Sequence, residues 1–135
     1  MKRNFLFALL FGVTAVVSVL LRAEPVLSQS GTKLPSTITV ASSPNPSTLN
    51  ETVTLTAIVR AVRPDDGIPT GTVEFFLGPD SLGTTPLLSG AMDATASISV
   101  NLPAGLHPIH TTYSGDSTFL GGISGPPIPQ EVSVN

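Results

Sequence analysis

The sequence predicts an all-β protein in which two antiparallel sheets pack face to face as a sandwich. Three observations predict this fold class. Beyond residue 35, apolar and polar residues alternate with a period of two over short stretches. Clusters of Pro, Gly, Asp and Asn separate these stretches about every dozen residues. No stretch beyond the N-terminal segment has the 3.6-residue period of a helix, so each sheet has to cover its apolar face with another sheet.

About seven strands are expected between residues 36 and 135. The clearest covers residues 52–59, where Val53, Leu55, Ala57 and Val59 alternate with three threonines and Ile58. The inward faces of the other strands are marked by Ile38 and Val40; Val73, Phe75 and Leu77; Ala96, Ile98, Val100 and Leu102; His107, Ile109, Thr111 and Tyr113; and Val132 and Val134. A segment near residues 82–88 contains Pro86, which lacks an N–H group and therefore indicates an edge or irregular strand.

The first 23 residues are typical of a secretory signal peptide and are expected to form a helix ahead of the sandwich. Lys2 and Arg3 form a basic start, and no charged residue follows from Phe5 to Leu21. Ala23 offers a cleavage site, and residues 26–28 offer a second one. We favour cleavage after Ala23 and export by the general secretory route. Retention as a membrane anchor is the alternative, because the apolar run is long enough to span a bilayer.

The remaining chain divides into two parts. Residues 24–35 are rich in Ser, Gln, Gly, Thr and Pro and have no periodicity, so they are expected to form a flexible lead-in. Residues 36–135 are expected to form one domain. Beyond residue 23 there are nine acidic residues and three basic ones, Lys33, Arg60 and Arg63, which gives a net charge of −6. A surface of this sign repels phosphate, so nucleic acid is excluded as a partner.

The chain contains no cysteine. Disulfides, thiolate metal sites and a lipid anchor on cysteine are therefore all excluded, and apolar packing has to stabilise the domain by itself.

Short motifs follow one another in order along the predicted domain: Ser36–Val40, Ser43–Ser47, Val53–Ala57, Pro69–Phe75, Leu102–Gly105 and Tyr113–Asp116, followed by Phe119. Together they resemble the bacterial Ig-like domain repeat family. The resemblance implies an immunoglobulin-like β-sandwich without catalytic residues, of the kind that forms stalks, adhesin segments or appendages of carbohydrate-active enzymes. The chain differs from the family in having one copy, Pro108 and His110 where Thr is usual, and Thr111 where Ala is favoured.

The residues suited to catalysis or metal binding are few and separated. His107 and His110 are three residues apart and so lie on opposite faces of a strand, where they cannot bind one metal together. We expect His107 to be buried and bonded to the backbone, and His110 to be exposed. Residues 115–117, Gly-Asp-Ser, resemble a hydrolase nucleophile block, but no histidine follows them, and Gly and Asp are residues that a hairpin turn requires.

The loop carboxylates and the aromatic residues point to no ligand either. Asp65, Asp66, Asp80 and Asp93 lack the spacing of a calcium loop, so solvated turn residues are expected, with a weak loop-end calcium site as the minor alternative. Phe76 is the one aromatic residue expected to point outward, which disfavours a carbohydrate-binding platform. We therefore assign no catalytic, cofactor-binding or metal-binding residue.

The sequence thus predicts an exported, non-enzymatic Ig-like module with a structural, spacer or adhesive role at the cell surface or outside the cell, with the periplasm as a further possible location. Its partner would be a protein or a glycan. Two alternatives stay open. One is a ligand-binding module that takes a glycan, or a peptide strand added to a sheet edge. The other is a terminal fragment of a longer Ig-repeat surface protein.

Overall fold

The computed structural model describes residues 32–134. The helix expected for the signal peptide, in residues 1–23, lies outside the described residues. Residues 32–134 form ten strands and one 3₁₀ turn: β1 (Ser36–Ser43), β2 (Ser47–Thr48), β3 (Thr52–Ala61), the 3₁₀ turn η4 (Pro64–Asp66), β4 (Thr72–Leu77), β5 (Asp80–Pro86), β6 (Leu88–Ser89), β7 (Ala94–Asn101), β8 (Gly105–Tyr113), β9 (Gly122–Ile123) and β10 (Ile128–Ser133).

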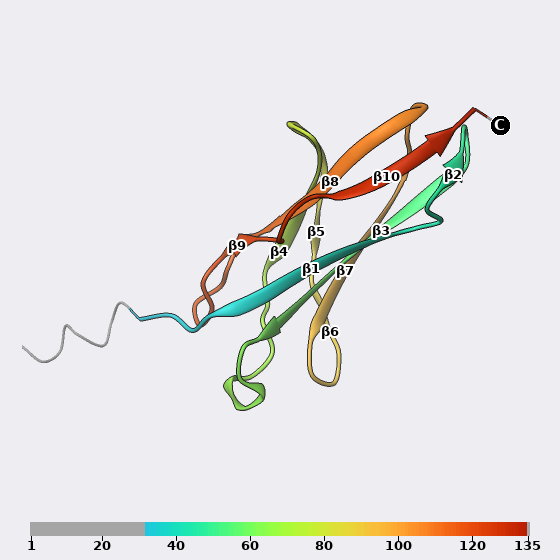
Figure 1. The fold of residues 1–135 in the computed structure, drawn as a ribbon. Coiled ribbons are helices and arrows are strands. Elements are labelled where there is room, and N and C mark those ends of the chain that lie inside the picture. The colour runs from blue at the N-terminus through green and yellow to red at the C-terminus, as the bar shows by residue number, and fades with distance from the viewer. Residues whose placement is uncertain (1–31, 135) are drawn as a thin grey trace, which may run out of the picture. The chain divides into compact units, whose positions relative to one another are not determined.

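The strands form two sheets that face each other (Figure 1). One has the order β1-β3-β7-β6 and the other the order β2-β10-β8-β4-β5, with β9 added beside β8. All pairs are antiparallel except β2 with β10. Seven of the strands described here have six residues or more, and this number and arrangement confirm the predicted immunoglobulin-like sandwich.

The core lies between the two sheets and is built from the alternation seen in the sequence. In β3, Val53, Leu55, Ala57 and Val59 are fully buried, while the intervening threonines face outward. Their sheet is held in register because β3 pairs with β1 on one side and with β7 on the other. The facing sheet contributes fully buried apolar side chains that include Val73, Phe75 and Ile109.

Two features of the strands differ from the prediction. The segment near residues 82–88 is not one strand. β5 belongs to one sheet and β6 to the other, so the chain crosses between the layers just after Pro86. The inward assignment of Val134 is wrong, since β10 ends at Ser133 and Val134 is 73% exposed.

The inward residue missed in β10 is Gln130, which is fully buried. Its side-chain Nε2 donates hydrogen bonds to the carbonyl of Pro44 and the hydroxyl of Ser47, at 3.1 and 3.2 Å. A buried amide needs such partners, and both come from the segment just before and within β2. The final strand is therefore tied to a part of the chain more than 80 residues earlier.

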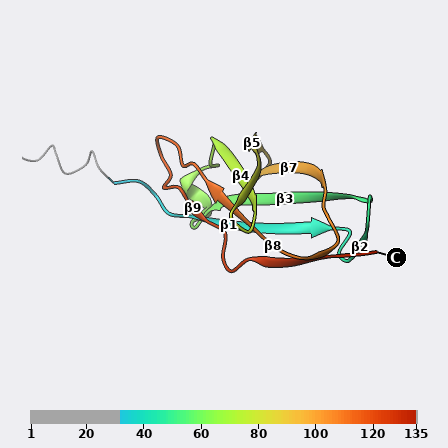
Figure 2. The same ribbon diagram turned by 90° about the horizontal axis from the view of Figure 1, so that it is seen from above.

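The chain enters and leaves the sandwich at opposite ends (Figures 1 and 2). At the entry end, Leu34 accepts a hydrogen bond from the N–H of Leu120 and donates one to the carbonyl of Thr118. Leu34 had been expected in the flexible lead-in, but these bonds attach it to the domain. At the exit end, the carbonyl of Ser133 accepts a hydrogen bond from the N–H of Leu49.

Replacing Val53 with Asp should unfold the domain, because an unpaired charge would be forced between the sheets. The free energy of unfolding should fall by about 3 kcal/mol or more, which is a large part of the stability of a small domain. Thr54→Asp is the matched control, because Thr54 is the neighbouring residue and is exposed; its effect should stay within about 0.5 kcal/mol. Thermal melts followed by circular dichroism measure both. An unchanged melting temperature for Val53→Asp would show that this position faces water.

Candidate functional site

The two histidines lie on opposite faces of β8, as their spacing predicts. The Nε2 atom of His107 lies 2.7 Å from the carbonyl oxygen of Pro103, so the imidazole bonds the backbone as expected. It is half-buried rather than buried. Neither histidine is placed beside a nucleophile, and the backbone bond gives His107 a structural role at the start of the strand.

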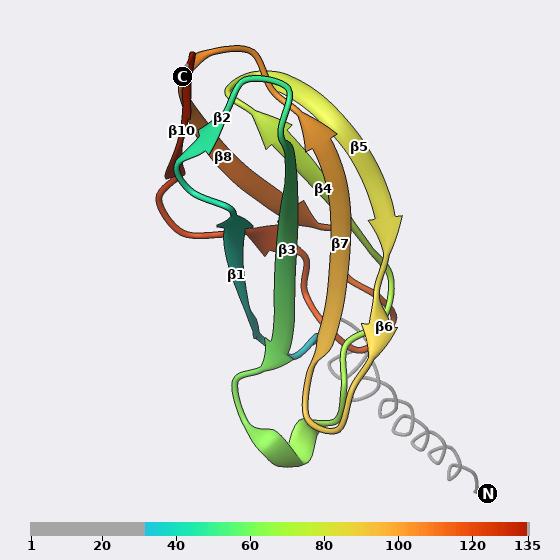
Figure 3. The same ribbon diagram turned by 90° about the vertical axis from the view of Figure 1, so that its right-hand side faces the viewer.

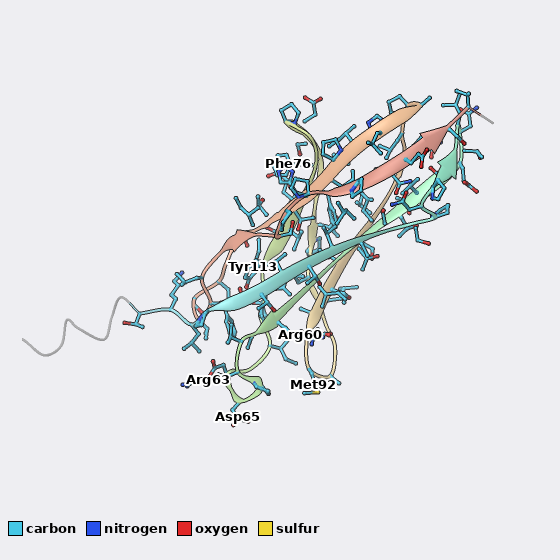
Figure 4. The ribbon with its side chains drawn as sticks, in the orientation of Figure 1. Arg60, Arg63, Asp65, Phe76, Met92 and Tyr113 are labelled. Atoms are coloured by element: carbon cyan, nitrogen blue, oxygen red, sulfur yellow. The ribbon has the colours of Figure 1, made fainter. Side chains whose placement is uncertain are left out.

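His110 is half-buried, whereas we had expected it to be exposed. Its ring stacks on that of Phe76, with the ring centroids 4.9 Å apart and the planes 5° from parallel. The two residues are directly opposite each other in the β4–β8 pair, and such cross-strand partners cannot be read from either strand alone. Phe76 does lie on the outer face of its sheet (Figure 4). One face of its ring is covered by the imidazole, so it is not a bare platform for a sugar.

The densest polar cluster lies at the entry end and is centred on Asp116. One carboxylate oxygen, Oδ2, accepts hydrogen bonds from the backbone N–H and the hydroxyl of Thr70, at 2.8 and 2.7 Å. The other, Oδ1, accepts from the N–H groups of Thr118 and Phe119, at 2.7 and 2.6 Å. Residues 114–121 are thus a loop, as the Gly and Asp predicted, but one that is fixed to a residue 46 positions earlier.

These hydrogen bonds determine the protonation state of Asp116. Burial acts to raise its pKa, but the bonds from Thr70, Phe119 and Thr118 to the ionised carboxylate outweigh burial and lower the pKa from 3.8 to about 2. A carboxylate with this pKa and four donors around it is a poor proton acceptor near neutral pH. Asp116 therefore acts as a clasp between two loops and not as a catalytic base.

Tyr113 reinforces the same clasp. Its hydroxyl donates a 2.6 Å hydrogen bond to the carbonyl of Thr70, and its ring is buried in the core. Burial and the nearby charge of Asp116 raise the pKa of Tyr113 to about 12, so the hydroxyl remains a donor. Gly115 has a φ of 78°, and a Cβ there would lie 2.7 Å from the amide nitrogen of Gly121. Only glycine fits this position.

The loop carboxylates do not converge. Asp93 forms an ion pair with Arg60 at 2.9 Å, Asp65 lies in the turn η4 at the entry end, and Asp80 begins β5. Among residues 32–134, no group of three or more His, Cys, Asp or Glu side chains is arranged to hold a metal ion.

Two shallow hollows mark the surface of the described residues. The larger lies at the entry end, beside Arg60 and the 68% exposed Met92 (Figure 4). The smaller is lined by Pro108, Pro127 and Pro129 next to His107. Neither hollow brings a nucleophile together with a free base.

An all-β sandwich with two facing sheets in this order, and with its polar clusters used as structural clasps, defines an immunoglobulin-like module. The sequence matches the family described as bacterial Ig-like domain (group 3) over residues 27–135. The chain therefore belongs to this family, as the motifs between residues 36 and 119 indicated. No curated protein matches the chain.

Membership of this family makes the chain a structural module of a kind that typically lies outside the cell or on its surface, in a family that is generally non-enzymatic. Between residues 32 and 134, no helix has the length and apolar character needed to cross a bilayer.

Replacing Asp116 with Asn should lower the free energy of unfolding by about 2 kcal/mol, because hydrogen bonds to a charged group are lost and the new amide N–H₂ faces donors. Asp80→Asn is the matched control, since Asp80 is an exposed residue at the start of β5. Urea unfolding at pH 7 measures both variants. Equal midpoints for the wild type and Asp116→Asn would contradict the clasp.

The same clasp gives a pH dependence. The pKa of Asp116 is lower in the folded chain than in the unfolded one, so its contribution is complete above about pH 4 and is lost as the pH falls towards 2. The stability of the wild type should therefore fall more steeply than that of Asp116→Asn over this range. Parallel curves for the two proteins would be the contrary result.

Proposed function

We propose that this chain is exported and acts as a non-enzymatic spacer outside the cell or at its surface. The observation that carries the proposal is the placement of the chain ends at opposite ends of the sandwich (Figure 1). A module with this geometry adds its own length between whatever is attached before and after it. A module whose ends lie together adds none.

The first and last long strands are suited to carry load between these ends. β1 is joined to β3 over eight residue pairs, from Ser36 with Ala61 to Ser43 with Thr54. β10 is joined to β8 over five pairs. Hydrogen bonds in antiparallel pairs run perpendicular to the strands. A pull along the strands therefore loads many of these bonds together.

The polar residues also support a non-enzymatic role. Three groups that could serve in catalysis are engaged in the fold: His107 on a carbonyl, His110 in a ring stack, and Asp116 with four donors. A catalytic acid or base has to be within reach of a substrate and to change protonation near the working pH. The Asp116 carboxylate, with its pKa of about 2, does not meet the second condition.

Export rests on the sequence of residues 1–23, with their basic start, apolar run and Ala23. The general secretory route delivers such a chain to the periplasm or beyond it, and the absence of cysteine means that no oxidising step is needed for folding there. We place the working location outside the cell or on its surface.

Expression of the full-length chain in a bacterium should give a product that begins at Glu24 and is recovered outside the cytoplasm. N-terminal sequencing and cell fractionation measure this. Val17→Asp is a matched variant, because a charge in the apolar run should leave the intact chain in the cytoplasm. An intact chain from Met1 in the wild type, whether cytoplasmic or membrane-bound, would refute cleavage after Ala23.

Pulling on the two ends should extend the domain in one step. Cysteines introduced by Thr32→Cys and Val134→Cys provide the only attachment points, since the chain has no cysteine. Single-molecule force spectroscopy should show a length gain on the order of 300 Å, the span of about 100 extended residues less the folded length. The unfolded variant Val53→Asp should show no such step. A gradual extension of the wild type at low force would argue against a spacer.

A further inference from the structure

No strand is paired with the outer edge of β1, although the hydroxyl of Ser36 at its start donates a 3.3 Å hydrogen bond to the carbonyl of Leu120. β1 pairs only with β3, and the carbonyl of Pro35 accepts a hydrogen bond from Val62, so the backbone of Pro35 faces β3. Because backbone groups alternate along a strand, those of Thr37, Thr39 and Ala41 face β3 as well. The outward N–H and C=O groups are those of Ser36, Ile38, Val40 and Ser42. They make no hydrogen bond within residues 32–134.

The neighbouring edge strand, β10, is closed by a side chain. The amide of Asn45 donates a 2.7 Å hydrogen bond from Nδ2 to the carbonyl of Pro129 and accepts a 3.1 Å bond at Oδ1 from the N–H of Glu131. It therefore occupies the place that a residue of an added strand would take. Beyond it, β2 pairs with Val132 and Ser133.

The remaining edges are also protected. β5 begins at Asp80 and ends at Pro86, and its pairing with β4 is shifted at Phe75 and Phe76. β6 covers the start of β7, and β5 runs beside the rest of that strand (Figure 3). Charges, prolines, irregular pairing and short strands are the usual protections against edge pairing. β1 has none of them, since residues 36–43 contain no proline and no charge.

We propose that the edge of β1 pairs with β1 of a second copy of this chain, antiparallel, about a two-fold axis at Thr39. The two four-stranded sheets then join into one continuous sheet. Such an interface uses the same surface on both copies and closes at two. The proposal is independent of the spacer role, which holds for a single copy as well.

The backbone restricts this pairing to one complete register. Side chains on one face have to meet side chains on the same face, so even-numbered residues pair with even-numbered ones. With the axis at Thr39, Ile38 pairs with Val40 of the second copy, and Ser36 with its Ser42. Every outward group from Ser36 to Ser42 then finds a partner. A shift towards the start of β1 meets Leu34, whose outer side is already bonded to residues 118 and 120.

The edge of β1 is uncharged and its pairing is self-complementary, so β1 of a second copy fits it although the net charges of the two chains repel each other. Each chain carries a net charge of −6 beyond residue 23, so two copies repel each other over most of their surfaces. β1 is the uncharged stretch where they can approach. Its exposed side chains, Thr37, Thr39, Ala41 and Ser43, are small. At the axis the two Thr39 residues meet as a non-hydrogen-bonded pair, with Cα atoms about 4.5 Å apart.

A single cysteine tests the register. In the full-length chain, Thr39→Cys should form a disulfide-linked dimer, because that Cα separation lies within the range of disulfides. Thr37→Cys is the matched control on the same face of the same strand. Residue 37 lies opposite Ala41 of the second copy, so the two introduced cysteines are not opposite each other and this variant should form no disulfide-linked dimer. Non-reducing gels after air oxidation of the purified proteins measure both. Equal cross-linking of the two variants, or of neither, would overturn the proposal.

Charge at the axis tests the association without a covalent bond. Thr39→Lys and Thr39→Glu should each weaken the dimer severalfold, because like charges directly opposite each other destabilise a strand pair. An equimolar mixture of the two should restore it. Analytical ultracentrifugation measures the association, and thermal melts confirm that the exposed substitutions leave the fold intact. A wild type that sediments as a monomer up to about 1 mM, or a mixture no tighter than its components, would refute the pairing.

Discussion

The burial of two apolar sheet faces against each other holds this domain together. β3 supplies the centre of one face, where Val53, Leu55, Ala57 and Val59 have no exposed surface. Phe75 and Ile109 cover it from the facing sheet. Burying side chains of this size contributes about 1.5–3 kcal/mol each, and no disulfide adds to that sum. The packing of the two sheets against each other fixes the strands, and the strands in turn fix the positions of the loops and the sheet edges.

The strands that build the core were predictable because each has its apolar residues at every second position. β3 and β7 follow this pattern over their whole length, and the structure places them side by side in register. Thr111 falls on the inward face by the same rule and is fully buried. Its hydroxyl has no hydrogen-bond partner among the described residues, which agrees with the preference for alanine in the family that the motifs resembled.

What the sequence could not predict depends on contacts between distant residues. Gln130 is buried with its Nε2 bonded to Pro44 and Ser47, and nothing in the local pattern of β10 indicates these partners. Asp116 was recognisable as a turn residue, but its bonds to Thr70 depend on how two loops meet at one end of the sandwich. The stack of Phe76 on His110 depends on the pairing register of β4 and β8. In each case the polar or aromatic group has a partner that only the tertiary fold supplies.

The amide of Asn45 has a consequence for the size of any assembly. One side chain supplies the donor and the acceptor that a whole strand would otherwise offer to β10. A sheet whose two edge strands both have free backbone groups can add one chain after another and grow into a fibre. Asn45 closes the edge of β10, and the edges at β5 and β6 are protected by a charge, a proline and short or irregular pairing. Only the edge of β1 then remains for a second copy, so pairing stops at two chains. A long, uncharged, threonine-rich strand can thus stay at the surface of this protein without seeding polymerisation.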